Sequence, residues 1–409
     1  MKKICIITPG TIASNPRLVK EAEALSNSGY NVHLIYTRHV YYLVETDQKI
    51  LDDHPEWTYD YLDWSSPDAA SKVKKMGSGI KRKIANLILE SKLYPGQLVP
   101  VLFNRFYCWQ LYKAMSCKAD LYIAHYPESI AIAARAAKVN NAFFAFDAED
   151  FHRGEGASGG LTEAISTLED RFLPDAAYIT AASPLIAKAY QKLYPGVKIT
   201  SLENMFQLNK QPTFVELDNN SLKFFWFSQT VGPKRGLEEF IKILQVLGKK
   251  NVQLTLLGNC STSYKTQLQN LWFTLGLKPE SLVFKMTVPE AEIFTLAASH
   301  HFGLGLEISH SINRDICLTN KIYTYILSGN LLILSNTSAQ KNFYEKYPGV
   351  GLCIELNDPE QAAARILHLI ESSGDINAQR REIYKLGQST LNFDQEKKVL
   401  LKQVENLWA

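Results

Sequence analysis

The chain has 409 residues, of which 46% are hydrophobic and 21% charged, a composition typical of a soluble globular protein with more than one core. Its 44 basic and 41 acidic residues leave a net charge of +3, which excludes a nucleic-acid-binding surface spread over the whole chain. No apolar stretch is long enough to span a bilayer, and Pro9 and Gly10 end the first apolar run too early for a signal peptide.

In the first half of the chain, short apolar runs alternate with helical patterns, which predicts βα units and a parallel sheet. The expected strands are residues 3–8, 31–36, 121–125, 142–146 and 177–180. The expected helices are residues 16–28, 130–139, 161–172 and 185–193. We therefore assign residues 1–206 to a first Rossmann-like domain.

Residues 41–117 break this alternation, because basic runs there stand beside aromatic and aliphatic residues. One interpretation is an amphipathic patch, through residues 72–109, that rests on an anionic membrane face. The other is an inserted helical pair that covers the first sheet and keeps a charged, solvated face. We favour the helical pair, since the basic and apolar groups are separated in sequence and no single long amphipathic helix is evident.

The second half repeats the strand and helix series after a polar linker at residues 207–221. Its expected strands are residues 223–227, 253–257, 282–285, 302–306, 331–334 and 351–355. Its expected helices are residues 237–247, 264–275, 290–300 and 359–371. Residues 222–390 then form a second domain, and residues 391–409 a helix that packs back on the first. The predicted fold is α/β, with two tandem doubly wound Rossmann-like domains and a cleft between them.

Open α/β sheets bind ligands at the carboxyl ends of their strands. In the first half, six residues lie at or just beyond such places: Gly10, Arg17, His125, Asp147, Glu149 and Asp150. A core position and a pocket position are equally open for His125. The acidic group either caps a helix or holds sugar hydroxyls, and we favour the sugar. No GxGxxG motif is present, so a dinucleotide fingerprint is absent.

In the second half, Lys234 and Arg235 precede Gly236 at the mouth of a predicted strand. Two cations on a glycine-bearing loop suit a diphosphate, although an exposed turn is the alternative. A second anion-binding candidate is the helix that Thr319 caps, with Asn320 and Lys321 in its first turn and Gly329 at its end. The six cysteines form no metal-ligand pattern, so we expect reduced thiols, a cytoplasmic protein, no metal site and no bound cofactor.

Together these segments resemble the GT-B glycosyltransferases, most closely the family 4 enzymes that use nucleotide sugars. The similar segments, in order, are NPRLVKEAEALSNSGYNVHLI, DLYIAHYPES, ITSLENMF, FSQTVGPKRGLEEF and NKIYTYILSGNLLIL. The resemblance implies transfer of a sugar, with retention and without a metal ion, to a saccharide or lipid-linked acceptor in polysaccharide or glycolipid synthesis. It also implies a nucleotide diphosphate sugar as co-substrate, and a cytoplasmic protein with peripheral membrane contact as an open alternative.

The resemblance also implies roles for residues. The catalytic group would be His125, Asp147, Arg235 and Lys321. The donor group would be Lys234, Arg235, Gly236, Glu307, Asn320, Lys321 and Thr324. The acceptor side would hold Gly10, Arg17, His125, Glu149 and Asp150.

The chain departs from the family pattern at three positions: Thr324 and Ile316 replace a glutamate pair, and Glu149 replaces a histidine. A nucleotide-sugar 2-epimerase and a catalytically silent GT-B scaffold therefore stay open as alternatives.

Overall fold

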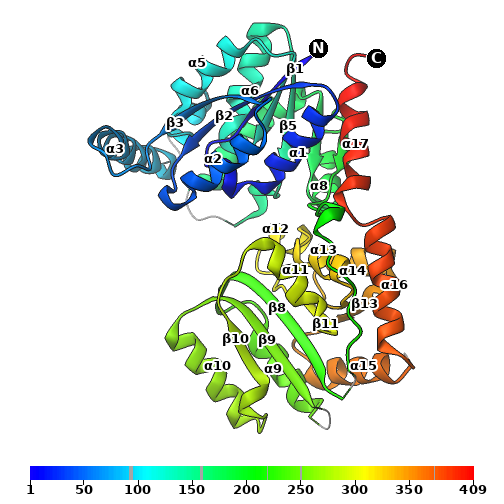
Figure 1. The fold of residues 1–409 in the computed structure, drawn as a ribbon. Coiled ribbons are helices and arrows are strands. Elements are labelled where there is room, and N and C mark those ends of the chain that lie inside the picture. The colour runs from blue at the N-terminus through cyan, green and yellow to red at the C-terminus, as the bar shows by residue number, and fades with distance from the viewer. Residues whose placement is uncertain (92–94, 157–159, 219, 249–250, 373) are drawn as a thin grey trace. The chain divides into compact units, whose positions relative to one another are not determined.

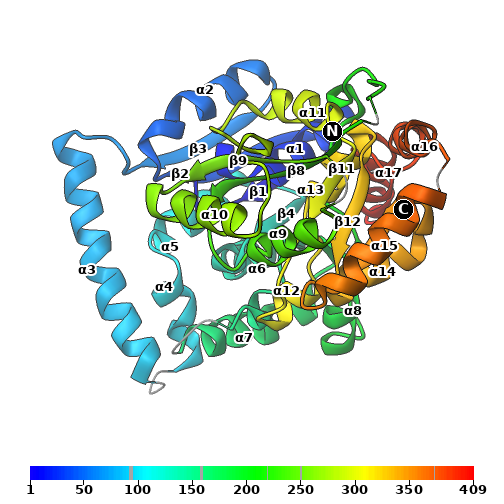
Figure 2. The same ribbon diagram turned by 90° about the horizontal axis from the view of Figure 1, so that it is seen from below.

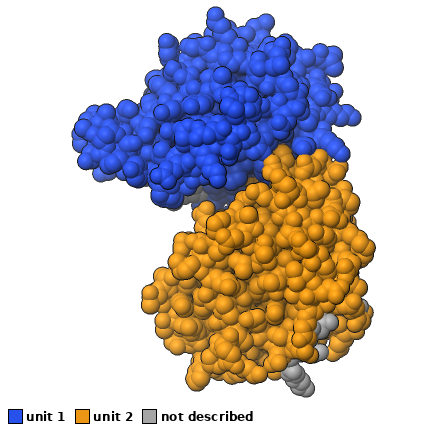
Figure 3. All heavy atoms as spheres, viewed as in Figure 1, with its two compact units in different colours: residues 1–203, 311–313, 397–409 blue, residues 204–310, 314–396 orange. Residues whose placement is uncertain are grey.

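The computed structural model describes residues 1–91, 95–156, 160–218, 220–248, 251–372 and 374–409. They divide into two compact units, coloured blue and orange in Figure 3. Unit 1 contains residues 1–203, 311–313 and 397–409, and unit 2 contains residues 204–310 and 314–396.

Unit 1 is built on a parallel seven-stranded sheet in the order β3-β2-β1-β4-β5-β6-β7 (Figure 1). Its strands are β1 (Lys3–Ile7), β2 (Asn31–Arg38), β3 (Thr58–Asp63), β4 (Leu121–His125), β5 (Phe143–Ala148), β6 (Tyr178–Ala181) and β7 (Ile199–Ser201). The five strands expected from the sequence are present, whereas β3 and β7 were missed. Both missed strands lie at the edges of the sheet and none of their residues is fully buried, so they lack the apolar run that marks the central strands.

The helices of unit 1 are α1 (Pro16–Asn27), α2 (Val44–Asp53), α3 (Ala69–Ser91), α4 (Val99–Phe103), α5 (Tyr107–Cys117), α6 (Pro127–Asn140), α7 (Leu161–Phe172) and α8 (Pro184–Leu193). The segment 41–117 is thus more than the expected helical pair, because its described residues form four α-helices and an edge strand. It also contains one long amphipathic helix, α3, which the sequence analysis wrongly judged to be absent.

Unit 2 is built on a parallel six-stranded sheet in the order β10-β9-β8-β11-β12-β13. Its strands are β8 (Leu222–Val231), β9 (Val252–Cys260), β10 (Leu282–Lys285), β11 (Phe302–Gly305), β12 (Leu331–Ser335) and β13 (Gly351–Ile354), all of which were expected. Its helices include α9 (Leu237–Val246), α10 (Thr262–Thr274), α11 (Glu290–Ala298), α13 (Lys321–Ser328), α14 (Ser338–Lys346), α15 (Pro359–Ser372) and α16 (Ile376–Ser389). The two sheets with their flanking helices confirm the predicted pair of Rossmann-like domains.

The chain passes from unit 1 to unit 2 between Glu203 and Asn204, ahead of the segment 207–221 that we expected to be the linker. That segment is held on unit 2 by hydrogen bonds. The Gln211 side-chain amide donates to the carbonyls of Leu327 and Tyr384, and Arg380 donates to the carbonyl of Val215.

Two short helices contribute residues to both units: α12 (Ile312–Ile316) and α17 (Phe393–Glu405). Residues 397–409 group with unit 1. There the ring of Trp408 lies 5.8 Å from that of Tyr30 and 6.1 Å from that of Phe143, and Leu400 and Val404 are buried.

Candidate functional site

Three neighbouring strands of unit 1 bring polar side chains into one row at the carboxyl end of the sheet. His125 on β4 is in register with Asp147 on β5, and Asp147 is in register with Thr180 on β6. Residues paired in this way point to the same face of a sheet. All three are buried, and the Thr180 hydroxyl donates to Asp147 Oδ1 over 2.5 Å.

Helix α1 supplies the charges that face this row. Asn15 caps the helix, since its side-chain oxygen accepts a hydrogen bond of 3.0 Å from the backbone N–H of Leu18, and Pro16 occupies the first helical position. The cap fixes Arg17 in the first turn and places Glu21 four residues later. Residues four apart lie on one helical face, so both side chains reach the same row of the sheet.

Hydrogen bonds and ion pairs join the members of the cluster, and only Glu21 Oε1 among their carboxylate oxygens is buried without a partner in the described structure. Arg17 donates from Nε and Nη2 to the two carboxylate oxygens of Asp147, at 2.6 and 2.7 Å, and from Nη1 to the carbonyl of Leu202. On the other side, His125 Nε2 lies 2.7 Å from Glu21 Oε2, and His125 Nδ1 lies 3.5 Å from Asp147 Oδ2.

The charges of the cluster follow from these contacts. Burial raises the pKa of Asp147, but the charges of Arg17 and His125 outweigh it and hold the pKa below its usual value. Burial lowers the pKa of His125, but its hydrogen bond to Glu21 and the charge of Asp147 outweigh it and raise the pKa. The cluster therefore fastens α1 to β4 and β5 with ion pairs. His125 and Asp147 are each 1% exposed, so direct contact with a sugar stays a prediction for them.

Glu149 and Asp150 follow β5 at the same edge, as expected, and both are half-buried. Burial raises the pKa of Glu149, and burial together with the charge of Glu149 raises the pKa of the Tyr126 hydroxyl. Tyr126 has a positive φ of 63°, an uncommon conformation for a residue with a bulky side chain. This strained residue directly follows β4 and links the acidic pair to a neighbouring pocket.

That pocket has a volume of about 420 Å³ and opens at the carboxyl ends of four adjacent strands. Gly10 follows β1, His39 follows β2, Trp64 follows β3 and Tyr126 follows β4. The complete lining is Pro9, Gly10, Ser14, His39, Trp64, Arg82, Phe103, Asn104, Arg105, Phe106, Tyr126 and Glu128. Ligands of doubly wound sheets bind at this edge, beside the point where the strand order reverses, which here lies between β1 and β4.

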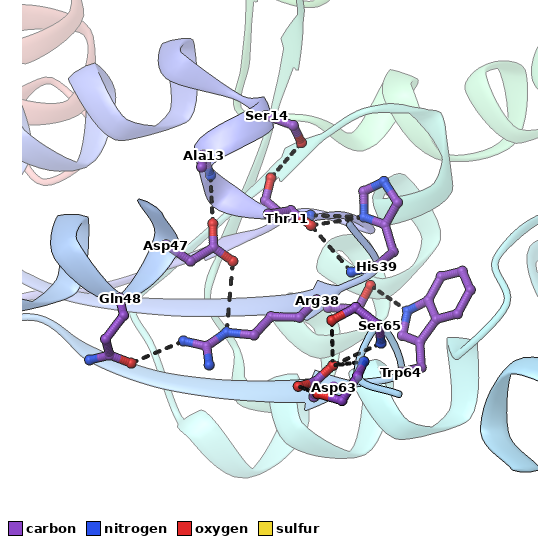
Figure 4. A network of polar contacts seen from close by, with 12 residues as sticks. Thr11, Ala13, Ser14, Arg38, His39, Asp47, Gln48, Asp63, Trp64 and Ser65 are labelled. Atoms are coloured by element: carbon purple, nitrogen blue, oxygen red, sulfur yellow. Dashed lines mark hydrogen bonds and ion pairs between the residues drawn. The ribbon is translucent and has the colours of Figure 1, made fainter. Parts of the chain in front are cut away.

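The polar contacts around this pocket fix its side chains (Figure 4). The backbone N–H of Thr11 donates to His39 Nδ1 over 3.2 Å, so His39 carries its proton on Nε2 when neutral. Burial and the charge of Arg105 lower the pKa of His39, which favours this neutral form. Beside it, Asp47 accepts a hydrogen bond of 2.8 Å from the N–H of Ala13 and lies 3.7 Å from Arg38.

The far wall of the pocket presents cations. The Arg105 guanidinium lies 4.8 Å from the centre of the Trp64 ring, and Arg82 Nη1 donates to the carbonyl of Phe103 over 2.8 Å. Burial and the neighbouring charge of Arg82 lower the pKa of Arg105. Burial also raises the pKa of Glu128, which lines the same pocket. Aromatic rings beside guanidinium and carboxyl groups suit a saccharide or another polar molecule with apolar faces.

Sequence reasoning found Gly10 of this pocket but assigned no site role to His39, Trp64, Arg82, Arg105 or Glu128. His39 could have been predicted as a site residue, because it follows an expected strand. Trp64 could not have been predicted in the same way, because β3 was missed. Arg82 was noticed only as part of a basic run, and Arg105 was not singled out.

In unit 2, the predicted cationic loop connects β8 to α9. Lys234 and Gly236 both have positive φ, at 61° and 75°, which turns the chain tightly before the helix. A Cβ atom on Gly236 would lie 2.9 Å from Leu356 Cδ1, and the positive φ itself favours glycine there. Lys234 is exposed and Arg235 half-buried, and neither forms an ion pair within the described part of the chain.

The other donor candidates lie around α13, which begins one residue later than expected, with Asn320 at its N-cap. Asn320 makes no side-chain capping bond, and the backbone N–H groups of Ile322 and Tyr323 donate instead to the carbonyls of Thr319 and Asn320, over 3.2 and 3.1 Å. Lys321 Nζ lies 3.2 Å from Glu307 Oε1 and 5.3 Å from the centre of the Trp226 ring, so this lysine is already paired. Thr324 is 1% exposed, and its role toward a ribose stays a prediction.

Among the residues that the structure describes, no group of three or more His, Cys, Asp or Glu side chains could hold a metal ion. Over the same residues, no helix is both long and apolar enough to cross a membrane.

Comparison with solved structures shows the fold. HepE from Anabaena, in complex with UDP-glucose, matches with a TM-score of 0.65 and 15% identity over 99% of this chain and 100% of that one. Sucrose-phosphate synthase from Thermosynechococcus elongatus matches with a TM-score of 0.68 and 13% identity over 100% and 99%. A glycosyltransferase from Rickettsia africae matches with a TM-score of 0.67 and 14% identity over 100% and 99%.

No protein-family model and no curated protein sequence matches the chain. The structural matches cover it almost from end to end, and the fold is the GT-B arrangement of two Rossmann-like domains.

Proposed function

We propose that the chain is a glycosyltransferase that moves a sugar from a nucleotide diphosphate sugar to a hydroxyl group of a saccharide or lipid-linked acceptor. The solved structures that share its fold over nearly its whole length include glycosyltransferases, and one of them holds UDP-glucose. Unit 2 would bind the donor and the pocket of unit 1 would receive the acceptor. Retention of anomeric configuration and independence of metal ions belong to the same proposal.

One observation carries the proposal: two cations, Lys234 and Arg235, stand without ion-pair partners in the described structure, on a tight loop at the carboxyl end of β8. An unpaired cation costs little when exposed and gains most when an anion arrives. The positive end of the α13 dipole lies at the same edge of that sheet, together with the ammonium group of Lys321. These groups suit a diphosphate better than a neutral ligand.

In the transfer step, the bond between the sugar C1 and the diphosphate oxygen breaks while C1 bonds to the acceptor oxygen. The acceptor proton passes to a diphosphate oxygen, so no nucleophile from the protein is needed. Arg235, Lys234 and Lys321 stabilise the charge that grows on the leaving diphosphate. Glu307 holds Lys321 in position through their ion pair.

The test is calorimetry of nucleotide diphosphates and their sugars with the wild type and with Arg235→Ala and Lys321→Ala. We expect each variant to bind at least about tenfold more weakly and to slow transfer, since a well-placed donor contributes roughly 2–4 kcal/mol in the transition state. Lys278→Ala is the matched control, because it removes an exposed lysine that precedes β10, at the opposite end of the same sheet. Added chelator should leave the rate unchanged.

Three results would redirect the proposal. Equal binding by both variants and the control would place the diphosphate elsewhere. Release of nucleotide and an epimerised sugar without any acceptor would indicate a 2-epimerase. A folded wild type that binds no nucleotide in the panel would favour a silent scaffold.

A further inference from the structure

Helix α3 exposes a continuous apolar stripe. Val73, Met76, Ile80, Ile84 and Leu87 are 53–67% exposed and recur every three or four residues, so they lie along one face. Single exposed apolar residues are ordinary on a protein surface, whereas an unbroken row over four turns indicates a binding surface.

The opposite face of α3 is the one turned to the protein. Its buried residues are Ser71, Ser78, Ala85 and Leu89, mostly small, and the helix contacts α4 and α7. The usual surface helix buries its large aliphatic side chains and exposes polar ones. Here the large side chains face outward, and Figure 2 shows α3 at the edge of its unit with its outer side uncovered by that unit. Packing within unit 1 therefore does not account for the stripe.

The charge of α3 indicates what kind of partner binds the apolar stripe. Residues 69–91 contain six basic residues and one acidic residue, a formal charge of +5 in a chain whose total is +3. At 100° per residue, Lys72 and Lys83 flank the stripe on one side, and Lys74 and Lys81 on the other. A second copy of this helix would be repelled by the same charge. Protein partners prefer aromatic and arginine anchors over an aliphatic row rimmed by lysines.

We propose that α3 lies in the interface of an anionic lipid bilayer, with the aliphatic stripe in the boundary between headgroups and acyl chains and the exposed Lys72 and Lys83 on the phosphates. An apolar face bordered by lysines is the pattern of helices that lie in this interface. Its 23 residues extend for about 35 Å, parallel to the membrane plane rather than across it.

The same helix forms part of the pocket, which gives the docking a consequence. Arg82 on α3 lines the pocket, and Lys81 Nζ lies 3.3 and 3.0 Å from the carbonyl oxygens of Asn104 and Arg105 on its wall. If the pocket receives the acceptor, as in the proposed function on which this step rests, the bilayer that holds α3 also presents a lipid-linked acceptor to the pocket.

The test is flotation of the full-length protein with vesicles of phosphatidylcholine alone and of phosphatidylcholine with phosphatidylglycerol. We expect binding only to the anionic vesicles, and weaker binding as salt is raised. Lys72→Gln with Lys83→Gln should weaken it about 30-fold, since each lysine near the surface contributes about 1 kcal/mol. Ile80→Gln with Ile84→Gln should weaken it by more than about tenfold. Phe273→Gln, at another 72% exposed apolar residue, is the control and should bind like the wild type.

Circular dichroism checks that each variant is folded, and nucleotide binding by calorimetry should be unchanged in all of them. Normal nucleotide binding without vesicle binding would overturn the membrane proposal alone, whereas vesicle binding without nucleotide binding would overturn the proposed function alone. Equal binding to neutral and anionic vesicles would also overturn the role of the lysines. A dimer in sedimentation that the isoleucine variants dissociate would assign the stripe to a second copy of the chain instead.

Discussion

Replacing Asp147 with asparagine tests whether the buried cluster of unit 1 holds that unit together. Asp147 accepts two hydrogen bonds from Arg17 and one from Thr180, and it lies 3.5 Å from His125. The amide keeps the shape of the carboxylate but removes its charge, which leaves the Arg17 guanidinium buried without its counter-ion. Removing one partner of a buried ion pair costs about 3–5 kcal/mol.

The assay is urea unfolding of the wild type and Asp147→Asn, followed by fluorescence and circular dichroism. In a thermal melt, the same loss lowers the melting temperature of a unit of about 200 residues by about 6–20 °C. Glu382→Gln is the control, because it makes the same chemical change in an exposed pair with Lys385, and we expect less than about 1 kcal/mol there.

The double variant Arg17→Met with Asp147→Asn separates charge from packing. Because it removes both members of the pair, it should be at least about 1 kcal/mol more stable than the sum of the two single losses predicts. Additive losses, or a single loss at Asp147 no larger than that of the control, would refute the reasoning and leave the cluster without a structural role.

Three further changes test single features. Burial raises the pKa of Asp47 from its usual 3.8 to about 6, so the folded state holds a proton that the unfolded state releases between these values. The contribution of Asp47 to stability should therefore fall by about 2 kcal/mol as pH rises from about 4 to about 6, and urea titrations across that range should show a smaller fall for Asp47→Asn. Gly236→Ala should lower the free energy of unfolding by about 1–2 kcal/mol in chemical denaturation, since the φ of Gly236 is positive and the added Cβ atom would contact Leu356 too closely. An unchanged free energy of unfolding would contradict the loop conformation. Arg380→Met should cost unit 2 more than about 2 kcal/mol in a melt, because the buried carbonyl groups of Gly329 and Ala298 lose their donor, and a loss below about 1 kcal/mol would contradict this.

The central strands could be predicted from the sequence because burial on both faces demands an apolar run. Residues 331–334 form such a run, the strand is buried throughout, and Gly329 ends the preceding helix in the left-handed conformation. The edge strand β3 could not be predicted in this way, since Tyr59 and Tyr61 stay 39% and 43% exposed and polar residues alternate with them. Helix α3 was missed for a related reason, because its large apolar residues face solvent and its small ones face the protein.

The site was less accessible to sequence reasoning because it depends on strand order. His39 and Trp64 meet in one pocket only because β2 and β3 are neighbours in the sheet. The sequence identified Lys321 as a cation at a helix start and Glu307 as a strand-end carboxylate. It could not show that these side chains, 14 residues apart, form an ion pair.

Arg17 in unit 1 and Arg235 in unit 2 are both cations near strand ends, but they differ in what an anion would have to displace in order to bind. Arg17 is 4% exposed and donates three hydrogen bonds, so a phosphate could reach it only by breaking the bidentate pair with Asp147. Such a displacement gives up charge-assisted bonds to form others of the same kind, and leaves a buried carboxylate unpaired. Arg235 forms no ion pair within the described part of the chain, so an arriving diphosphate displaces only water. For this reason we expect Arg17→Met to act on the stability of unit 1 and Arg235→Ala on nucleotide affinity. Calorimetry with UDP would contradict this division if the two losses of affinity were equal in folded variants.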